Sequence, residues 1–186
     1  MNRLAQEAAT EHVGVGSDDL KDKNPMRKRI SSQPQRERPS ENTGWLDLEA
    51  LARVEVTSED AAYPIESALL LVCATGWRAE SPGEQTIRLF FEAPQRLKRI
   101  RLLFREEKEA RTQEFVLRWS PTADGSSRDI VRQQYHFSPS GATEEIEEYR
   151  VELEDVVALE VTIVPNISGG DAYASLAELR LAGNGD

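Results

Sequence analysis

The fold of this chain is decided by one stretch, residues 113–120, which reads Gln-Glu-Phe-Val-Leu-Arg-Trp-Ser. Its large apolar side chains, Phe115, Leu117 and Trp119, alternate with other residues and therefore fall on one side of an extended chain. Asp124 and Gly125 follow as turn residues. The stretch predicts a β-strand with one buried face that ends in a turn.

The same alternation recurs along the chain on both sides of this stretch. It predicts strands over residues 53–58, 85–92, 97–105, 113–120, 128–137, 149–153, 159–163 and 176–181. Pro94 is expected to end the second of these strands. One short helix is predicted over residues 64–70, because Pro64 opens it and its apolar residues share one face. About eight short strands separated by turn residues predict an antiparallel sandwich or barrel.

The first 43 residues differ from the rest of the chain. Residues 1–43 contain no Phe, Tyr or Trp and no sustained apolar period. Such a segment cannot bury enough apolar surface to offset its ordering entropy, so we expect a disordered polar tail. The β-domain is predicted to span residues 44–183. Met26 opens a basic run, and a translation start there is the alternative to a start at Met1.

Charge and composition exclude several classes of function. The chain carries 33 acidic and 23 basic residues, and all but 7 acidic and 8 basic residues lie outside the tail. A domain this acidic is a poor candidate for nucleic-acid binding. No apolar run approaches the roughly 20 residues of a membrane-spanning helix. The polar N-terminus and the single cysteine, Cys73, predict a cytoplasmic protein without an internal disulfide.

Sequence signatures of catalysis are absent. Histidine occurs only at His12 and His136, so one chain cannot build a multi-histidine metal site. There is no Gly-x-Ser-x-Gly motif and no glycine-rich loop that opens a helix after a strand. Paired carboxylates, which could hydrolyse a glycoside, are expected by chance in so acidic a chain. The sequence therefore predicts a protein that is not an enzyme.

Six segments, taken in order over residues 52–182, carry a resemblance to a known family. They are a strand that ends at Ser58, a helical turn at 65–69, Gly76-Trp77-Arg78, a strand at 85–89, the stretch 115–120 with its Asp-Gly turn, and a closing strand at 176–181. In this order they resemble the discoidin or coagulation-factor type C domain. The resemblance implies a galactose-binding-like fold, an antiparallel jelly-roll β-sandwich with one short helix.

The resemblance also implies a non-catalytic binding module. Carbohydrate is the family's commonest bacterial ligand and is held by loops at one end of the sandwich. Many members carry a structural calcium ion near the first loop and the Glu of the last strand, which Glu178 matches. This chain lacks the family's loop Asp and Gly and has Leu70-Leu71-Val72-Cys73 there. Because calcium needs six or more oxygen ligands, we expect no cofactor and no tight calcium site.

Seven loop residues are candidate ligand contacts at one end of the sandwich. Indole packs on the apolar face of a sugar ring, while guanidinium, amide and carboxylate groups bond its hydroxyls. The candidates are Trp77, Arg78, Arg111, His136, Asn166, Asp171 and Tyr173. The other interpretation of Trp77 is a buried plug, and the other interpretation of the remaining six is ordinary polar loops. Carbohydrate binding is the leading hypothesis, and a module that docks to a protein partner is the alternative.

Two clusters of charge lie on predicted strands. Three arginines share an outward face and either bind an anion or pair with acidic side chains: Arg99, Arg101 and Arg105. Four glutamates form an acidic cluster: Glu144, Glu145, Glu147 and Glu148. We interpret this cluster as a charged edge that deters strand pairing, with a cation site as the alternative.

Overall fold

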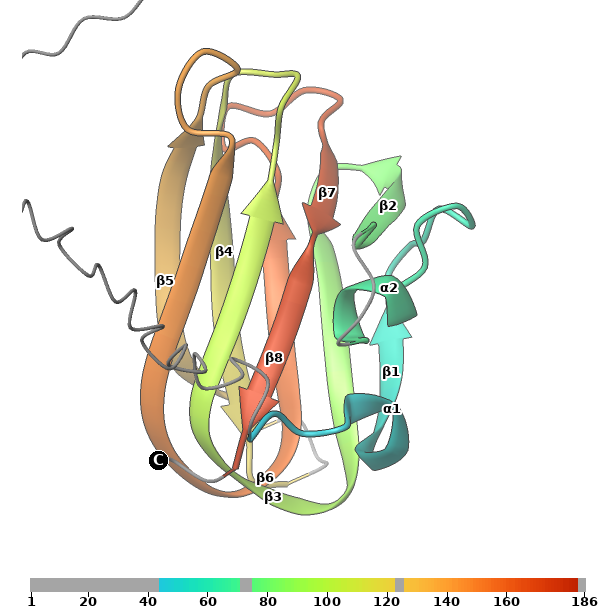
Figure 1. The fold of residues 1–186 in the computed structure, drawn as a ribbon, viewed down its shortest axis with the longest axis vertical. Coiled ribbons are helices and arrows are strands. Elements are labelled where there is room, and N and C mark those ends of the chain that lie inside the picture. The colour runs from blue at the N-terminus through green and yellow to red at the C-terminus, as the bar shows by residue number, and fades with distance from the viewer. Residues whose placement is uncertain (1–43, 71–74, 123–125, 184–186) are drawn as a thin grey trace, which may run out of the picture. The chain divides into compact units, whose positions relative to one another are not determined.

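The strands form two packed layers, as Figure 1 shows. The computed structural model describes residues 44–70, 75–122 and 126–183. Its elements in chain order are α1 (Leu48–Leu51), β1 (Ala52–Val56), α2 (Glu66–Leu69), β2 (Trp77–Pro82), β3 (Gln85–Arg105), β4 (Arg111–Ser120), β5 (Arg128–Phe137), β6 (Glu144–Val164), β7 (Tyr173–Leu176) and β8 (Glu178–Ala182). The predicted all-β class is confirmed.

The long strands β3 and β6 run through both layers. Each has 21 residues, and the two pair antiparallel with register shifts confined to the part of β3 between Phe90 and Arg99. Both strands bend there, and Asp155 of β6 takes a positive φ of 56°. One half of this ribbon joins β1, β4 and β5 in the first layer. The other half joins β8 in the second layer.

The prediction of four separate strands along this ribbon is wrong. Pro94 does not end a strand, because it lies inside the register shift of β3. The ladder is already interrupted at such a bulge, so the missing N–H of proline leaves no ladder hydrogen bond unmade. Residues 149–153 and 159–163 are likewise two halves of β6. A bulge interrupts the period of two in the same way as a loop, and the alternation cannot tell them apart.

A two-stranded sheet of β2 and β7 lies beside the main layers. Trp77 pairs with Leu176 and Arg78 with Ser175, so the prediction of a loop at this tryptophan is wrong. The expected closing strand is divided into β7 and β8. The predicted helix is confirmed as the shorter α2, whereas α1 was not predicted. Among the described residues, no helix has the length and apolar character that crossing a bilayer requires.

Three predictions fall on residues outside the described ranges. They concern the polar tail over residues 1–43, the role of Cys73, and the turn at Asp124 and Gly125. These remain predictions.

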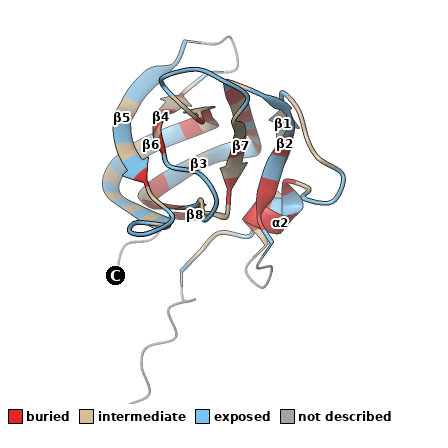
Figure 2. Ribbon diagram, turned by 90° about the horizontal axis from the view of Figure 1, so that it is seen from above, coloured by how far each residue is buried: buried red, intermediate tan, exposed pale blue. Residues whose placement is uncertain are grey.

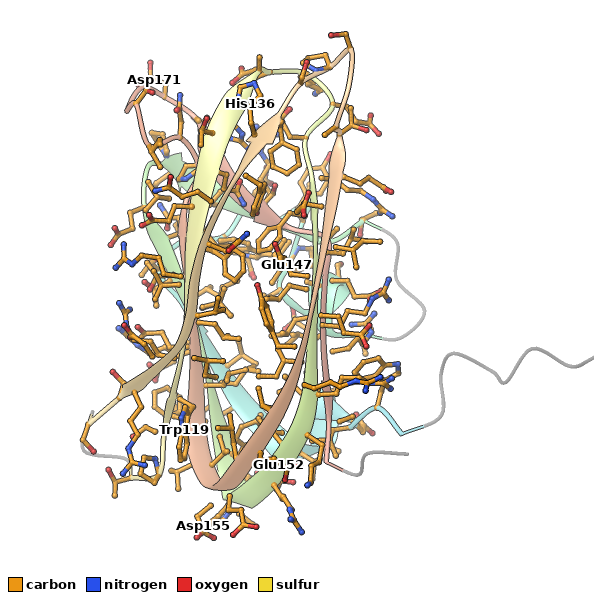
Figure 3. The ribbon with its side chains drawn as sticks, turned by 90° about the vertical axis from the view of Figure 1, so that its left-hand side faces the viewer. Trp119, His136, Glu147, Glu152, Asp155 and Asp171 are labelled. Atoms are coloured by element: carbon orange, nitrogen blue, oxygen red, sulfur yellow. The ribbon has the colours of Figure 1, made fainter. Side chains whose placement is uncertain are left out.

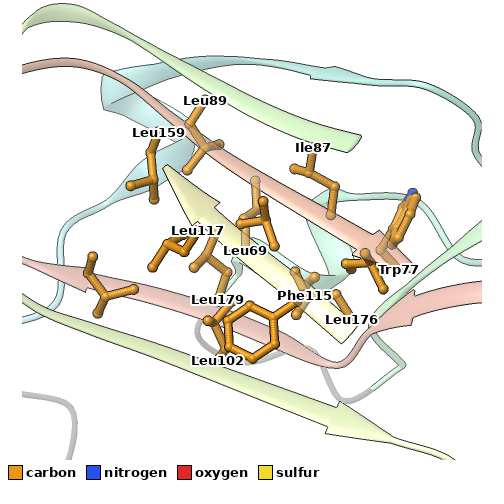
Figure 4. Close-up of a cluster of buried hydrophobic side chains, with 14 of the residues drawn as sticks. Leu69, Trp77, Ile87, Leu89, Leu102, Phe115, Leu117, Leu159, Leu176 and Leu179 are labelled. Atoms are coloured by element: carbon orange, nitrogen blue, oxygen red, sulfur yellow. The ribbon is translucent and has the colours of Figure 1, made fainter. Parts of the chain in front are cut away.

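The hydrophobic core lies between the two layers (Figures 2 and 4). Phe115 and Leu117 are fully buried in it, and Trp119 packs against it while partly exposed. The Phe115 ring centroid lies 5.2 Å from that of Phe104, which belongs to the second layer. The stretch at residues 113–120 is therefore a central strand whose Phe115 face packs in the core, as predicted, although Val116 on its other face is buried too, with 3% exposed.

Phe115→Ala tests this placement. The change removes a fully buried ring, and we expect the free energy of unfolding to fall by about 3–5 kcal/mol in urea denaturation. Ile146→Ala is the control, because Ile146 is an exposed hydrophobic side chain on β6. Its expected change is below about 0.5 kcal/mol. Equal losses in the two variants would contradict the position of β4 in the core.

Candidate functional site

Four connections meet at one end of the sandwich, which we call the loop end. They join β2 to β3, β3 to β4, β5 to β6, and β6 to β7. Figure 3 shows His136 and Asp171 at this end, with Trp119 and Asp155 at the opposite end. The loops that follow the strands therefore place polar side chains from distant parts of the sequence next to one another.

A cavity of about 410 Å³ opens at the loop end, and we call it the loop-end cavity. Its walls come from β2, from β7 and from the loop that joins β3 to β4. Five of the seven candidate residues line it: Trp77, Arg78, Arg111, Asp171 and Tyr173. These residues are up to 96 positions apart in the chain, and the pairing of β2 with β7 brings them together.

Trp77 is buried, with 1% of its surface exposed, and belongs to the core cluster shown in Figure 4. Gly76 precedes it with a φ of 68°, and a Cβ there would lie 2.7 Å from the Cα of Ala177. Glycine is therefore needed for this close approach to the end of β7. The interpretation of Trp77 as an exposed platform for a sugar ring is wrong, because neither face of the indole is open. Its Nε1–H still has no acceptor among the described residues.

Arg111 is buried at the start of β4 and fixed by two contacts. Its Nη2 lies 2.9 Å from Glu106 Oε2, and its Nη1 donates to the backbone carbonyl of Tyr173 at 3.1 Å. Burial lowers the pKa of the guanidinium, while Glu106 and Glu109 act in the opposite direction. The side chain stays charged at neutral pH. Its Nε–H has no acceptor among the described residues.

Two residues of the cavity lining, Trp77 and Arg111, thus carry buried N–H donors that have no acceptor in the part of the chain that the structure describes. A buried donor without a partner costs about 1–3 kcal/mol. An oxygen atom of a ligand that reached either group would remove that cost.

Tyrosine rings and Arg78 form the outer part of the cavity. The Arg78 guanidinium lies 5.1 Å from the ring centroid of Tyr173 and stacks on it. The backbone N–H of Arg78 donates to the carbonyl of Tyr63 at 3.1 Å, which holds Tyr63 at the rim. Tyr63 is 38% exposed and is the aromatic ring that the sequence analysis missed. The available signal was a lone aromatic in a polar segment with no strand period.

The charges around the cavity balance. Four cationic residues line it, Arg78, Arg105, Lys108 and Arg111, together with four acidic residues, Glu106, Glu107, Glu109 and Asp171. Equal numbers of opposite charges produce little net field, so the lining does not favour a highly charged ligand. It offers both donors and acceptors to a neutral polar ligand.

His136 and Asn166 lie at the loop end but do not line the cavity. The Nδ1 of His136 is 3.1 Å from the hydroxyl of Thr112 on the neighbouring strand. The side-chain oxygen of Asn166 accepts a hydrogen bond from the backbone of Ser168 at 3.1 Å. Asn166 therefore stabilises its own turn, as Asn commonly does.

The outward row of arginines on β3 pairs with acidic side chains, as one of the two interpretations predicted. Arg101 lies 2.8 Å from Glu178, and Arg105 lies 2.6 Å from Glu144. The pair of Arg105 with Glu144 is exposed, and exposed pairs contribute little to stability, typically about 0–1 kcal/mol each. The row therefore resembles an ordinary charged surface.

The exposure of the four glutamates at the start of β6 follows the alternation of side chains along the strand. Glu145 and Glu147 are half-buried, whereas Glu144 and Glu148 are exposed. Along residues 144–153, no described strand pairs with β6 on the side away from β3, so the cluster occupies an open edge. Tyr149 donates its hydroxyl to Glu147 at 2.6 Å. Burial raises the pKa of Glu145, and the neighbouring charge of Glu147 adds to the effect.

Glu145→Gln tests this electrostatic cost. A carboxyl with a higher pKa in the folded than in the unfolded protein destabilises the fold when ionised. We expect the change to raise the free energy of unfolding at pH 7, by less than about 1 kcal/mol because Glu145 is only partly buried and solvent screens its charge. The gain should vanish below pH ~4, where Glu145 is protonated in both states.

Urea unfolding at neutral and at acid pH measures the difference in the free energy of unfolding between Glu145→Gln and the wild-type protein. Glu144→Gln is the matched control, because Glu144 is exposed and paired with Arg105. We expect this change not to raise the free energy of unfolding. A gain from Glu145→Gln that persists at acid pH would contradict the role of its charge.

Solved structures share this fold. A family 32 carbohydrate-binding module from Clostridium perfringens NanJ, in complex with galactose, matches with a TM-score of 0.55 and 12% identity, covering 74% of this chain and 97% of that one. A structure with two modules of the same family from C. perfringens ZmpB, in complex with GalNAc, matches with a TM-score of 0.58 and 14% identity. The match covers 77% of this chain and 37% of that one. The family 32 module of AlyQ, in complex with 4,5-unsaturated mannuronic acid, matches with a TM-score of 0.51 and 17% identity. The match covers 70% of this chain and 94% of that one.

No protein-family model matches the sequence, and no curated protein does. The structural matches confirm the discoidin-like, galactose-binding jelly-roll fold that the resemblance implied. At identities of 12–17% they concern the fold alone.

Proposed function

We propose that this protein is a non-catalytic carbohydrate-binding module that holds its ligand in the loop-end cavity. One observation carries the proposal: the residues that line the cavity include an exposed tyrosine at its rim and two whose buried N–H donors have no acceptor among the described residues. Its volume of about 410 Å³ lies in the range of small-ligand sites. The sugars in the matching solved structures support this class of ligand without selecting one sugar.

The side chains that line the cavity complement the apolar face and the hydroxyl groups of a sugar. The exposed ring of Tyr63 packs on the apolar face of the sugar. Arg78 and Asp171 are exposed at the cavity and bond hydroxyl groups as donor and acceptor. Arg111 and Trp77 also line the cavity, and each carries a buried N–H donor that has no acceptor among the described residues. The balanced charges of the lining suit a ligand without a large net charge.

The proposal includes no chemical step. His136, the one histidine in the described ranges, is engaged with Thr112 outside the cavity. Glu106 holds Arg111 in place through an ion pair. A binding role requires only contacts that complement the ligand, and the cavity provides these.

A glycan array of the full chain, followed by calorimetry with the sugar that binds, tests the proposal. We expect Tyr63→Ala and Arg78→Ala each to weaken binding at least about tenfold, the effect of losing roughly 1.4 kcal/mol of contact. The melting temperature should stay unchanged in both, because both side chains are exposed. Ile167→Ala is the matched control: Ile167 is 46% exposed at the same end but lies outside the cavity.

Two results would contradict the proposal. Full sugar affinity in both cavity variants would place the ligand elsewhere on the protein. A blank array, together with capture of a stoichiometric protein partner, would identify a docking module instead.

A further inference from the structure

A buried arginine lies where the family resemblance implies a calcium ion. The implied ion would lie between Glu178 and the loop that follows α2. Arg180 places its guanidinium there, with 5% of its side chain exposed. Its Nη1 donates to the carbonyl of Ala68 at 2.8 Å, and its Nη2 donates to the carbonyl of Leu70 at 2.7 Å. Nη1 also lies 2.9 Å from the carbonyl of Leu179.

The groups at this position do not fit calcium. Calcium takes six to eight oxygen ligands. The carbonyls of Ala68 and Leu70 are already bonded to Arg180, and the carboxylate of Glu178 contacts two arginines, Arg101 at 2.8 Å and Arg180 at 3.5 Å. A divalent cation would meet two guanidinium groups at close range, which opposes its entry. In the described ranges, no three or more His, Cys, Asp or Glu side chains form a group that could hold a metal.

We propose that the Arg180 guanidinium serves as a built-in cation in place of calcium. It joins the end of α2 to the closing strand β8 by bonding loop carbonyls and a strand carboxylate at the same time. A planar guanidinium with five donors suits this task. The carbonyls at the end of a helix have no intrahelical partner, so Arg180 supplies donors that these groups require. The protein therefore needs no divalent ion to fold.

The same contacts lie, in the sequence, between two residues that line the loop-end cavity. Tyr63 at its rim lies just before α2, and Trp77 in its lining begins the strand that follows the same loop. Arg180 bonds the carbonyls of Ala68 and Leu70, which lie between Tyr63 and Trp77 in the sequence and 110 residues or more away from Arg180. Arg180 itself does not line the cavity.

The wild-type chain gives the first test. A ligand that binds only the folded protein raises its melting temperature. We expect the melting temperature in about 5 mM calcium chloride to equal that in EDTA within about 1 °C, because the site holds no calcium. A calcium-dependent rise of several degrees that Glu178→Gln abolishes would overturn the proposal.

Arg180→Met gives the second test. It leaves buried carbonyls and a carboxylate without their donor, so we expect the melting temperature to fall by about 8 °C or more. Amide exchange at Ala68 and Leu70 should accelerate beyond the change in global stability. Arg105→Met is the matched control, an exposed arginine of the adjacent strand, with an expected shift below about 2 °C.

Arg180→Lys completes the comparison if Arg180→Met does not fold. An ammonium group cannot bridge the carbonyls and the carboxylate together, so we expect this variant to melt below wild type while keeping the fold. Arg180 variants as stable as Arg105→Met, with unchanged exchange at Ala68 and Leu70, would overturn the proposal. None of these measurements uses a sugar, so their outcome is independent of the proposed ligand.

Discussion

The continuous pairing of β3 with β6 is the constraint on which the rest of the structure depends. Because both strands pass through both layers and bend together, each begins and ends at the loop end. The loops on either side of these strands are therefore collected at one end of the sandwich. The loop-end cavity follows from this arrangement, since it is bordered by the end of β3, the start of β4 and the β2–β7 pair. The bend thus decides where the loop-end cavity lies.

Two buried arginines, Arg180 and Arg111, differ in how fully their guanidinium groups are hydrogen-bonded. Arg180 bonds carbonyls and a carboxylate on the outer side of β8, and it connects two parts of the fold. Arg111 is held by Glu106 and Tyr173 but keeps one donor without an acceptor beside a cavity. Buried polar groups are usually satisfied, so the remaining N–H of Arg111 is an exception. Burial alone does not distinguish Arg180 from Arg111, whereas their hydrogen-bond partners do.

Much of the fold could be predicted from the sequence, because the burial of one face imposes a period of two on each strand. The prediction of Phe115 and Leu117 in the core rests on this period. It fails at Pro94, where a bulge and a loop have the same local pattern. The burial of Trp77 depends on the pairing of β2 with β7, for which no local signal exists. The contacts of Arg180 join residues about 110 positions apart, so they too required the structure.

The central claim is that the loop-end cavity offers buried donors to a sugar, and the indole N–H signals of the full chain test it most directly. The chain has three tryptophans, and Trp→Phe replacements assign their three signals in a ¹H–¹⁵N spectrum. Titration with a sugar that binds is predicted to move the Trp77 signal alone, because Trp119 lies at the opposite end and Trp45 is stacked under Arg99. An unmoved Trp77 signal at saturation, or a shift at Trp119 or Trp45 instead, would contradict the claim.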